Sequence, residues 1–181
     1  MTSLPNILTF SRIAVIPLIV ILFFIPMHWA AWGAFWLYVA ACVTDWLDGF
    51  LARRMKVVSD VGRFLDPIAD KLLVATLLFL FAATGRLNGI HILPAVVILL
   101  RELTVSGLRE YLGPKGIIVP VSKLAKWKTA SQMVALALLI PAQFGPPWAI
   151  YTGLAMLWIS AALTVQTGWD YIKTGLRHMT G

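Results

Sequence analysis

The sequence predicts an all-α membrane protein with six transmembrane helices. Of its 181 residues, 60% are hydrophobic and only 13% are charged, whereas about 25% of the residues of a soluble domain are charged. Six long apolar segments follow one another, and none alternates with the period of two expected of a membrane β-strand. Because lipid offers no hydrogen bonds to the backbone, helices are then the only spanning structure. We expect one domain over residues 1–181.

Each apolar segment approaches the roughly 20 residues that a spanning helix needs. In chain order the segments are Ile7–Ile25, Ala31–Leu51, Pro67–Ala83, Ile90–Leu112, Leu124–Ala142 and Trp148–Tyr171. The third is short, and Asp66 followed by Pro67 predicts its start, with Asp as the N-cap and Pro at the first helical position. Turn sequences at 26–28, 85–89 and 145–147 end the first, third and fifth segments.

The charges are distributed unequally between the two ends of these segments. The connections after the first, third and fifth segments contain a single charged residue, Arg86, whereas the other connections and the tail are basic. The positive-inside rule assigns the basic side, and with it both termini, to the cytoplasm. All eight acidic residues fall in or near the same half. Ionisable groups gathered at one depth of a membrane protein predict a functional site there.

Four aspartates lie where the second and third segments approach the cytoplasmic side. Asp45 and Asp48 are three residues apart, and Asp66 and Asp70 are four apart, so each pair shares one helix face. Each unpaired carboxylate buried at this depth would cost about 3 kcal/mol or more. Oxygen ligands select hard cations such as Mg²⁺ or Mn²⁺, and four aspartates suffice for two ions about 4 Å apart.

Small and basic residues accompany the aspartates in a pattern that suits a phosphate ligand. Gly49 and Ala52 allow a ligand to approach the backbone of the second helix closely. The guanidinium of Arg53 can bind phosphate oxygens in a bidentate manner. Gly62 is expected in the loop between the two helices, where it would also admit a ligand.

The complete pattern resembles the signature of the CDP-alcohol phosphatidyltransferase family. It reads Asp45-x2-Asp48-Gly49-x2-Ala52-Arg53-x8-Gly62-x3-Asp66-x3-Asp70, with every spacing of the signature intact. This resemblance implies six transmembrane helices around a cytoplasm-facing polar cavity, a dinuclear metal site in that cavity, and a homodimer.

The resemblance also implies roles for individual residues. The metal ligands would be Asp45, Asp48, Asp66 and Asp70, and Asp70 would in addition be the catalytic general base. The residues expected to bind CDP are Asp48, Gly49, Ala52, Arg53 and Gly62, joined by Asn6 and Thr9 of an opening that is similar to the N-x2-T-x2-R pattern of the family.

Two further segments, 101–110 and 121–133, are similar to the bacterial phosphatidylglycerophosphate synthases of the family. This likeness implies transfer of the phosphatidyl group of CDP-diacylglycerol to sn-glycerol 3-phosphate, giving phosphatidylglycerophosphate and CMP, in the bacterial cytoplasmic (inner) membrane. Basic residues beyond those expected at CDP favour an anionic acceptor. The candidates for its phosphate are Arg12, Arg101, Arg109, Lys123 and Lys126.

Alternatives remain open for several of these assignments. Arg101 and Arg109 can instead form ion pairs with acids of the fourth segment, although Glu102 is directed about 100° away from its neighbour around an ideal helix. Lys128 is expected to be a plain positive-inside or headgroup residue. The acceptor can be an inositol phosphate, serine or a phosphatidyl lipid. A cation transporter or channel is the alternative from another class, but it would place ionisable groups at several depths. The net charge of +7 is ascribed to contacts with lipid headgroups and phosphate rather than with nucleic acid.

Overall fold

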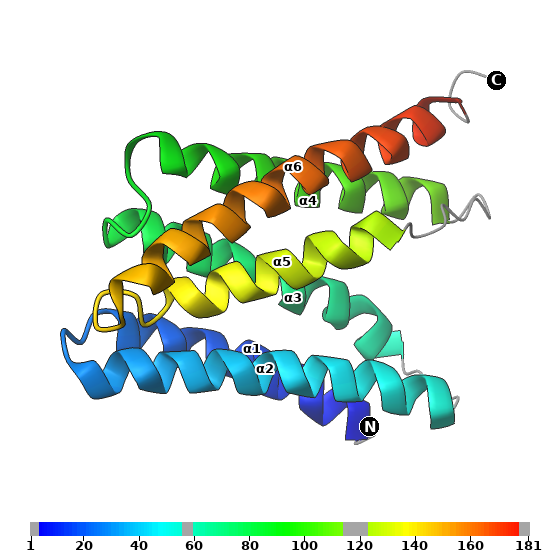
Figure 1. Cartoon of the computed structure of the whole chain (residues 1–181). Helices are drawn as coiled ribbons and strands as arrows, with labels where there is room; N and C mark the ends of the chain where they lie inside the picture. The colour runs from blue at the N-terminus through cyan, green and yellow to red at the C-terminus, as the bar shows by residue number, and fades with distance from the viewer. Residues whose placement is uncertain (1–3, 56–59, 114–122, 178–181) are drawn as a thin grey trace. The chain divides into compact units, whose positions relative to one another are not determined.

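The structure is a computed structural model that describes the backbone of residues 4–55, 60–113 and 123–177, and the side chains of residues 10–47, 65, 67–113, 124–169 and 171–173. All regular elements in these ranges are helical (Figure 1). They are α1 (Leu4–Phe23), α2 (His28–Met55), α3 (Asp60–Ala83), the short 3₁₀ helix η1 (Gly89–His91), α4 (Ile92–Leu112), α5 (Lys123–Leu139) and α6 (Pro147–Arg177). The prediction of an all-α protein is therefore confirmed.

The start predicted for the third segment is wrong. The helix α3 begins at Asp60, so Pro67 lies inside it and Asp66 is not its N-cap. A proline inside a helix removes one backbone hydrogen bond but does not oblige the helix to begin there. Gly62, which we expected in a loop, consequently lies in the first turn of α3. Other helix bounds also differ from the predicted segments: α1 begins at Leu4, α2 covers His28–Met55 and α6 runs to Arg177. The helix α5 ends at Leu139, two residues before Pro141, and the residue before a proline disfavours helical backbone.

Three of the described helices are long and apolar enough to cross a membrane. The candidate spans are His28–Leu47, Gly89–Leu112 and Pro147–Lys173, and α1 contributes a shorter apolar stretch, Phe10–Phe23. Only 22% to 33% of the most apolar window of each candidate span is buried inside the protein. Most of this apolar surface therefore faces outward, as expected for helices that have lipid as their solvent.

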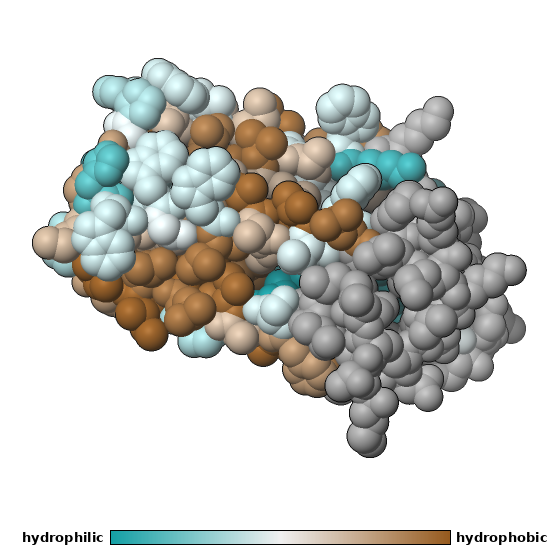
Figure 2. Space-filling model, turned by 90° about the horizontal axis from the view of Figure 1, so that it is seen from below, coloured by the Kyte–Doolittle hydropathy of each residue, from teal (hydrophilic) through white to brown (hydrophobic). Residues whose placement is uncertain are grey.

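The chain divides into two compact units, of which unit 1 comprises residues 1–86 and 137–150. In unit 1, α1 packs against both α2 and α3. The ring of Phe23 on α1 lies 5.9 Å from that of Phe81 on α3, and both side chains are buried. Hydrophobic and aromatic side chains cover much of the described surface in Figure 2. On α2 the exposed members include Trp29 and Trp36, as expected for residues near a lipid interface.

The connection after α3 is held against α1 by Arg86. Its Cζ lies 4.6 Å from the centroid of the Phe23 ring, and its Nη1 donates a 2.7 Å hydrogen bond to Oγ1 of Thr84. Burial lowers the pKa of Arg86 below its usual value. The cation–π contact stabilises the charged form against this desolvation.

Unit 2 comprises residues 87–136 and 151–181. Its buried apolar side chains include Ile98 on α4, Leu136 on α5 and Leu157 on α6. A 3.1 Å hydrogen bond from Nε1 of Trp158 to Nδ1 of His91 joins α6 to η1. Unit 2 also buries polar residues, which marks it as more than an apolar bundle. They are Lys128, Gln132, Ser160, Thr164 and Thr167.

The left-handed backbone of Gly85 yields a test of the fold. Its φ of 73° lies where a β-carbon is strained, so Gly85→Ala is expected to lower the free energy of unfolding by about 1 kcal/mol. Thermal unfolding of the detergent-solubilised protein measures this change. Gly113→Ala is the matched control, because Gly113 has a right-handed helical φ of −54° and open space around its Cα. Equal midpoints for the two variants would contradict the described turn.

Candidate active site

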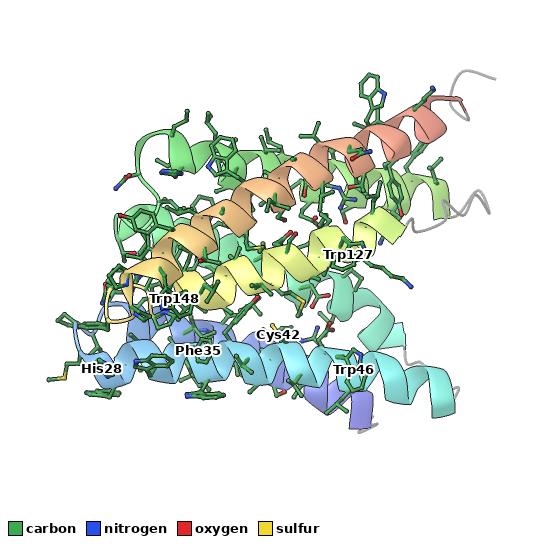
Figure 3. All side chains as sticks on the ribbon, viewed as in Figure 1. His28, Phe35, Cys42, Trp46, Trp127 and Trp148 are labelled. Atoms are coloured by element: carbon green, nitrogen blue, oxygen red, sulfur yellow. The ribbon has the colours of Figure 1, made fainter. Side chains whose placement is uncertain are left out.

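Two of the four predicted aspartates meet at a single guanidinium in unit 1. Nη1 of Arg12 donates a 2.7 Å hydrogen bond to Oδ1 of Asp70, and Nη2 of Arg12 lies 2.8 Å from Oδ1 of Asp45. The second contact is an ion pair without the alignment of a hydrogen bond. The cluster thus joins α1, α2 and α3 through one residue from each. In Figure 3 the labels of Cys42 and Trp46 mark the part of α2 that carries Asp45.

The burial of the three side chains differs in a way that suits a binding site. Arg12 is 1% exposed, whereas the side chains of Asp45 and Asp70 are 43% and 53% exposed. The guanidinium is therefore a fixed internal charge, whereas both carboxylates are partly exposed to solvent. A buried arginine without a partner would be costly, so the ion pairs also hold α1 in register with α2 and α3.

The other members of the predicted cluster lie on described helices, but their side chains fall outside the described set. These residues are Asn6 and Thr9 on α1, Asp48, Gly49, Ala52 and Arg53 on α2, Gly62 and Asp66 on α3, and Lys123 on α5. Their backbone positions keep Asp48 within one turn of Asp45, and Asp66 within about one turn of Asp70. Their roles stay predictions.

The donor atoms described here fit a hard divalent cation. Both carboxylates of the Arg12 cluster offer oxygen, and they converge on one positive charge, as ligands of a cation must. Among the side chains that the structure describes, no three of His, Cys, Asp and Glu gather at a metal-ligating distance. A complete ligand set would therefore need Asp48 and Asp66, the two aspartates whose side chains lie outside that set.

A second polar cluster lies in unit 2, where basic residues outnumber acids. Nη1 of Arg101 lies 3.0 Å from Oε1 of Glu102, and Nζ of Lys128 on α5 pairs with the same oxygen. Nη2 of Arg109 donates a 3.3 Å hydrogen bond to the hydroxyl of Tyr171 on α6. The described side chains of this cluster thus carry three positive charges and one negative charge. The excess favours an anionic ligand.

These contacts answer some expectations from the sequence and correct others. Arg101 does pair with Glu102, because the flexibility of the two side chains overcomes the 100° between their positions on the helix. Arg109 contacts Tyr171. Lys126, another acceptor candidate, is exposed on α5. Arg12, also predicted to bind the acceptor phosphate, contacts Asp45 and Asp70, and its role toward the acceptor stays a prediction.

Lys128 is the residue that the sequence analysis missed. We expected a plain surface lysine, but it is 6% exposed and paired with Glu102. The pattern that could have indicated its burial is the polar face of the helix. Ser131 and Gln132 lie three and four residues after Lys128, so polar side chains form a stripe along α5. A polar stripe on an otherwise apolar helix indicates an inward-facing position.

Comparisons with known proteins agree with the signature. A model of the CDP-alcohol phosphatidyltransferase family matches residues 2–166. Proteins named CDP-diacylglycerol–glycerol-3-phosphate 3-phosphatidyltransferase are similar over nearly the whole chain. The one from Cereibacter sphaeroides is 40% identical, covering 98% of this chain and 97% of its own. The one from Rickettsia typhi is 44% identical (96% and 97% covered), and that from Pseudomonas fluorescens is 38% identical (98% and 92% covered).

The described part of the chain is helical, and three of its helices are long and apolar enough to cross a membrane, which is typical of a membrane protein. With the match over residues 2–166, the chain belongs to the CDP-alcohol phosphatidyltransferase family.

The Arg12 cluster predicts how stability depends on divalent ions. Arg12→Gln leaves Asp45 and Asp70 without their common counter-charge, so the free energy of unfolding should fall. The loss should be smaller than the roughly 3–5 kcal/mol of a fully buried pair, because both carboxylates are half exposed. Added Mn²⁺ should restore part of this loss by supplying positive charge. Thermal unfolding with EDTA and with Mn²⁺ measures both effects.

Arg86→Gln is the control, since it removes a partly buried arginine of unit 1 that contacts Phe23 and Thr84 rather than the aspartates. It should be destabilised equally with and without Mn²⁺. If Mn²⁺ rescued both variants to the same extent, Arg12 would not be the counter-charge of the carboxylates.

Proposed function

We propose that the protein transfers the phosphatidyl group of CDP-diacylglycerol to sn-glycerol 3-phosphate, releasing phosphatidylglycerophosphate and CMP. The observation that carries this proposal is that Asp45 and Asp70 both contact Arg12. Both aspartates belong to the family signature, whose other members lie on α2 and α3. The names of the relatives from three bacteria support the acceptor.

In the proposed reaction a hydroxyl oxygen of the acceptor attacks the phosphorus that carries diacylglycerol. The new phosphorus–oxygen bond forms as the bond to CMP breaks, so CMP leaves with the electron pair. Asp70 takes the proton of the attacking hydroxyl as general base. Its half-exposed carboxylate is accessible to an acceptor, and the hydrogen bond from Arg12 orients it. This chemistry depends on positioning and on charge stabilisation.

The donor side of the site rests on the signature residues. Asp45, Asp48, Asp66 and Asp70 would hold two divalent ions, Mg²⁺ or Mn²⁺, whose positive charge would offset that of the pyrophosphate and of the departing CMP. Arg53 would bind phosphate oxygens, and Gly49, Ala52 and Gly62 would let the nucleotide approach the backbones of α2 and α3. Asn6 and Thr9 would complete the CDP site from α1.

The acceptor side rests on the basic cluster of unit 2. Glycerol 3-phosphate carries a phosphate dianion, and the excess of positive charge around Arg101 and Arg109 suits it. Serine and free inositol lack that phosphate and would leave the excess charge unused. Lys123 and Lys126 are the further candidates on α5.

We further propose that all six long helices span the bacterial cytoplasmic membrane as a single domain, with the site and both termini on the cytoplasmic side. The basic connections between the second and third and the fourth and fifth helices support this orientation. The acyl chains of the donor would then stay in lipid while its pyrophosphate reaches a cytoplasm-facing polar cavity. We also expect a homodimer.

An acceptor panel tests the proposed function directly. The purified protein in detergent should convert CDP-diacylglycerol with glycerol 3-phosphate at a rate at least tenfold above that with inositol phosphate, serine or a phosphatidyl lipid, a difference of about 1.4 kcal/mol in transition-state binding. EDTA should abolish turnover, and Mg²⁺ or Mn²⁺ should restore it. Preferential use of another acceptor would assign the chain to a different activity within its family.

The general base yields a separate prediction. Asp70→Asn keeps the size of the side chain but cannot take a proton, so kcat should fall by a factor of about 10² or more. Glu110→Gln is the matched control, because it neutralises an exposed acid on α4, and it should retain wild-type turnover. The unfolding midpoint checks that Asp70→Asn is folded. Substantial turnover in folded Asp70→Asn would remove Asp70 from the role of base.

A further inference from the structure

The stem of Arg101 lies against the bare backbone of α6 at Gly168. A β-carbon added at Gly168 would lie 2.9 Å from Cγ of Arg101, and 3.8 Å from its Nε. A separation below 3.0 Å is shorter than carbon atoms tolerate, so any side chain at position 168 would displace the stem of Arg101. Glycine is therefore the only residue at this position compatible with the described course of Arg101.

One helical turn further along α6, Tyr171 contacts both arginines of the basic cluster. The Cζ of Arg101 lies 5.8 Å from the centroid of the Tyr171 ring, and that of Arg109 lies 5.5 Å from it. The hydroxyl of Tyr171 accepts the hydrogen bond of Arg109. Tyr171 is 4% exposed, so its ring is a fixed platform. Both distances fall within the range of cation–π attraction.

The rest of the cluster leaves hydrogen-bonding capacity on Arg101. Glu102 uses one oxygen for both Arg101 and Lys128, and among the described residues the buried Nε of Arg101 has no hydrogen-bond partner. An arginine whose stem and guanidinium face are both held in place presents its N–H donors in a fixed direction, which suits the binding of an anionic group such as a phosphate. The elements that hold it are the backbone of Gly168 and the ring of Tyr171, which lie three residues apart on one face of α6.

We infer that Gly168 and Tyr171 are the positioning residues of the acceptor site: the bare backbone at 168 and the ring at 171 fix the direction of Arg101 and Arg109 toward the phosphate of the acceptor. This inference rests on the proposed function and extends it to α6, which contributes no residue to the signature. Neither residue touches the reacting atoms. They would increase the affinity for the acceptor, because the side chains of Arg101 and Arg109 would then lose less conformational entropy when the acceptor binds.

Steady-state kinetics on α6 variants tests the inference. Gly168→Ala and Tyr171→Leu should each raise KM for glycerol 3-phosphate on the order of tenfold, the equivalent of about one lost cation–π contact or a displaced arginine. KM for CDP-diacylglycerol should stay within about twofold of wild type. Tyr171→Phe keeps both ring contacts and loses only the hydroxyl, so its KM for glycerol 3-phosphate should rise about threefold at most.

Two controls match these changes elsewhere in the chain. Gly107→Ala adds the same methyl group to α4 where no atom lies within 4 Å, and Tyr151→Leu removes an exposed ring near the start of α6. Both should keep wild-type KM values. Alanine favours helical backbone over glycine, so Gly168→Ala is expected to fold, and it decides the question alone if Tyr171→Leu does not fold.

The kinetic pattern separates the inference from the proposed function. If the wild type uses glycerol 3-phosphate but Gly168→Ala leaves its KM unchanged, or impairs both substrates equally, the positioning role is overturned and the function stands. If the wild type does not use glycerol 3-phosphate at all, the proposed function falls, and the inference falls with it. A selective rise in KM for glycerol 3-phosphate supports both.

Discussion

A charged side chain buried among apolar helices needs a group of opposite charge beside it. This requirement determines how the helices of unit 1 contact one another at Arg12. The Arg12 guanidinium is almost fully buried, and its compensation comes from two other helices, through Asp45 on α2 and Asp70 on α3. Removing both carboxylates would leave the buried guanidinium without a described counter-charge, whereas removing one leaves it paired with the other. The geometry of unit 1 and the convergence of its carboxylates therefore have one common cause.

Among the described side chains, the polar cluster of unit 1 and that of unit 2 have opposite net charge. Around Arg12, the two described carboxylates outnumber the one guanidinium, so the cluster attracts cations. Among the described side chains of the unit 2 cluster, Arg101, Arg109 and Lys128 outnumber Glu102, so this cluster favours anions. In the proposed reaction, the first charge balance would suit divalent cations and the second would suit the phosphate of the acceptor.

The features that could be predicted from the sequence are those set by short-range pattern. Apolar length predicts the helices, and the spacings of Asp45, Asp48, Asp66 and Asp70 place each pair on one face. The prediction that Asp66 is an N-cap is wrong. Asp followed by Pro is a local signal for a helix start, but the residues before Asp66 are already helical. The helix α3 accordingly begins at Asp60 and runs through Pro67.

Contacts between distant residues could not be predicted in this way. Arg12 and Asp70 are 58 residues apart, and nothing in either local sequence identifies the other as its partner. The same holds for Arg101 and Tyr171, which meet only because α4 and α6 pack together. Lys128 shows the intermediate case, since the polar stripe on α5 marked its face but not its partner.

The central claim is that Asp45 and Asp70 belong to one cation-binding site. Binding of Mn²⁺, measured by electron paramagnetic resonance, tests this claim most directly. The wild-type protein in detergent should remove the signal of free Mn²⁺ with a measurable affinity. The double variant Asp45→Asn/Asp70→Asn should bind at least tenfold more weakly, because carboxylate charge dominates the affinity for hard cations. Undiminished Mn²⁺ affinity in a folded double variant would contradict the account.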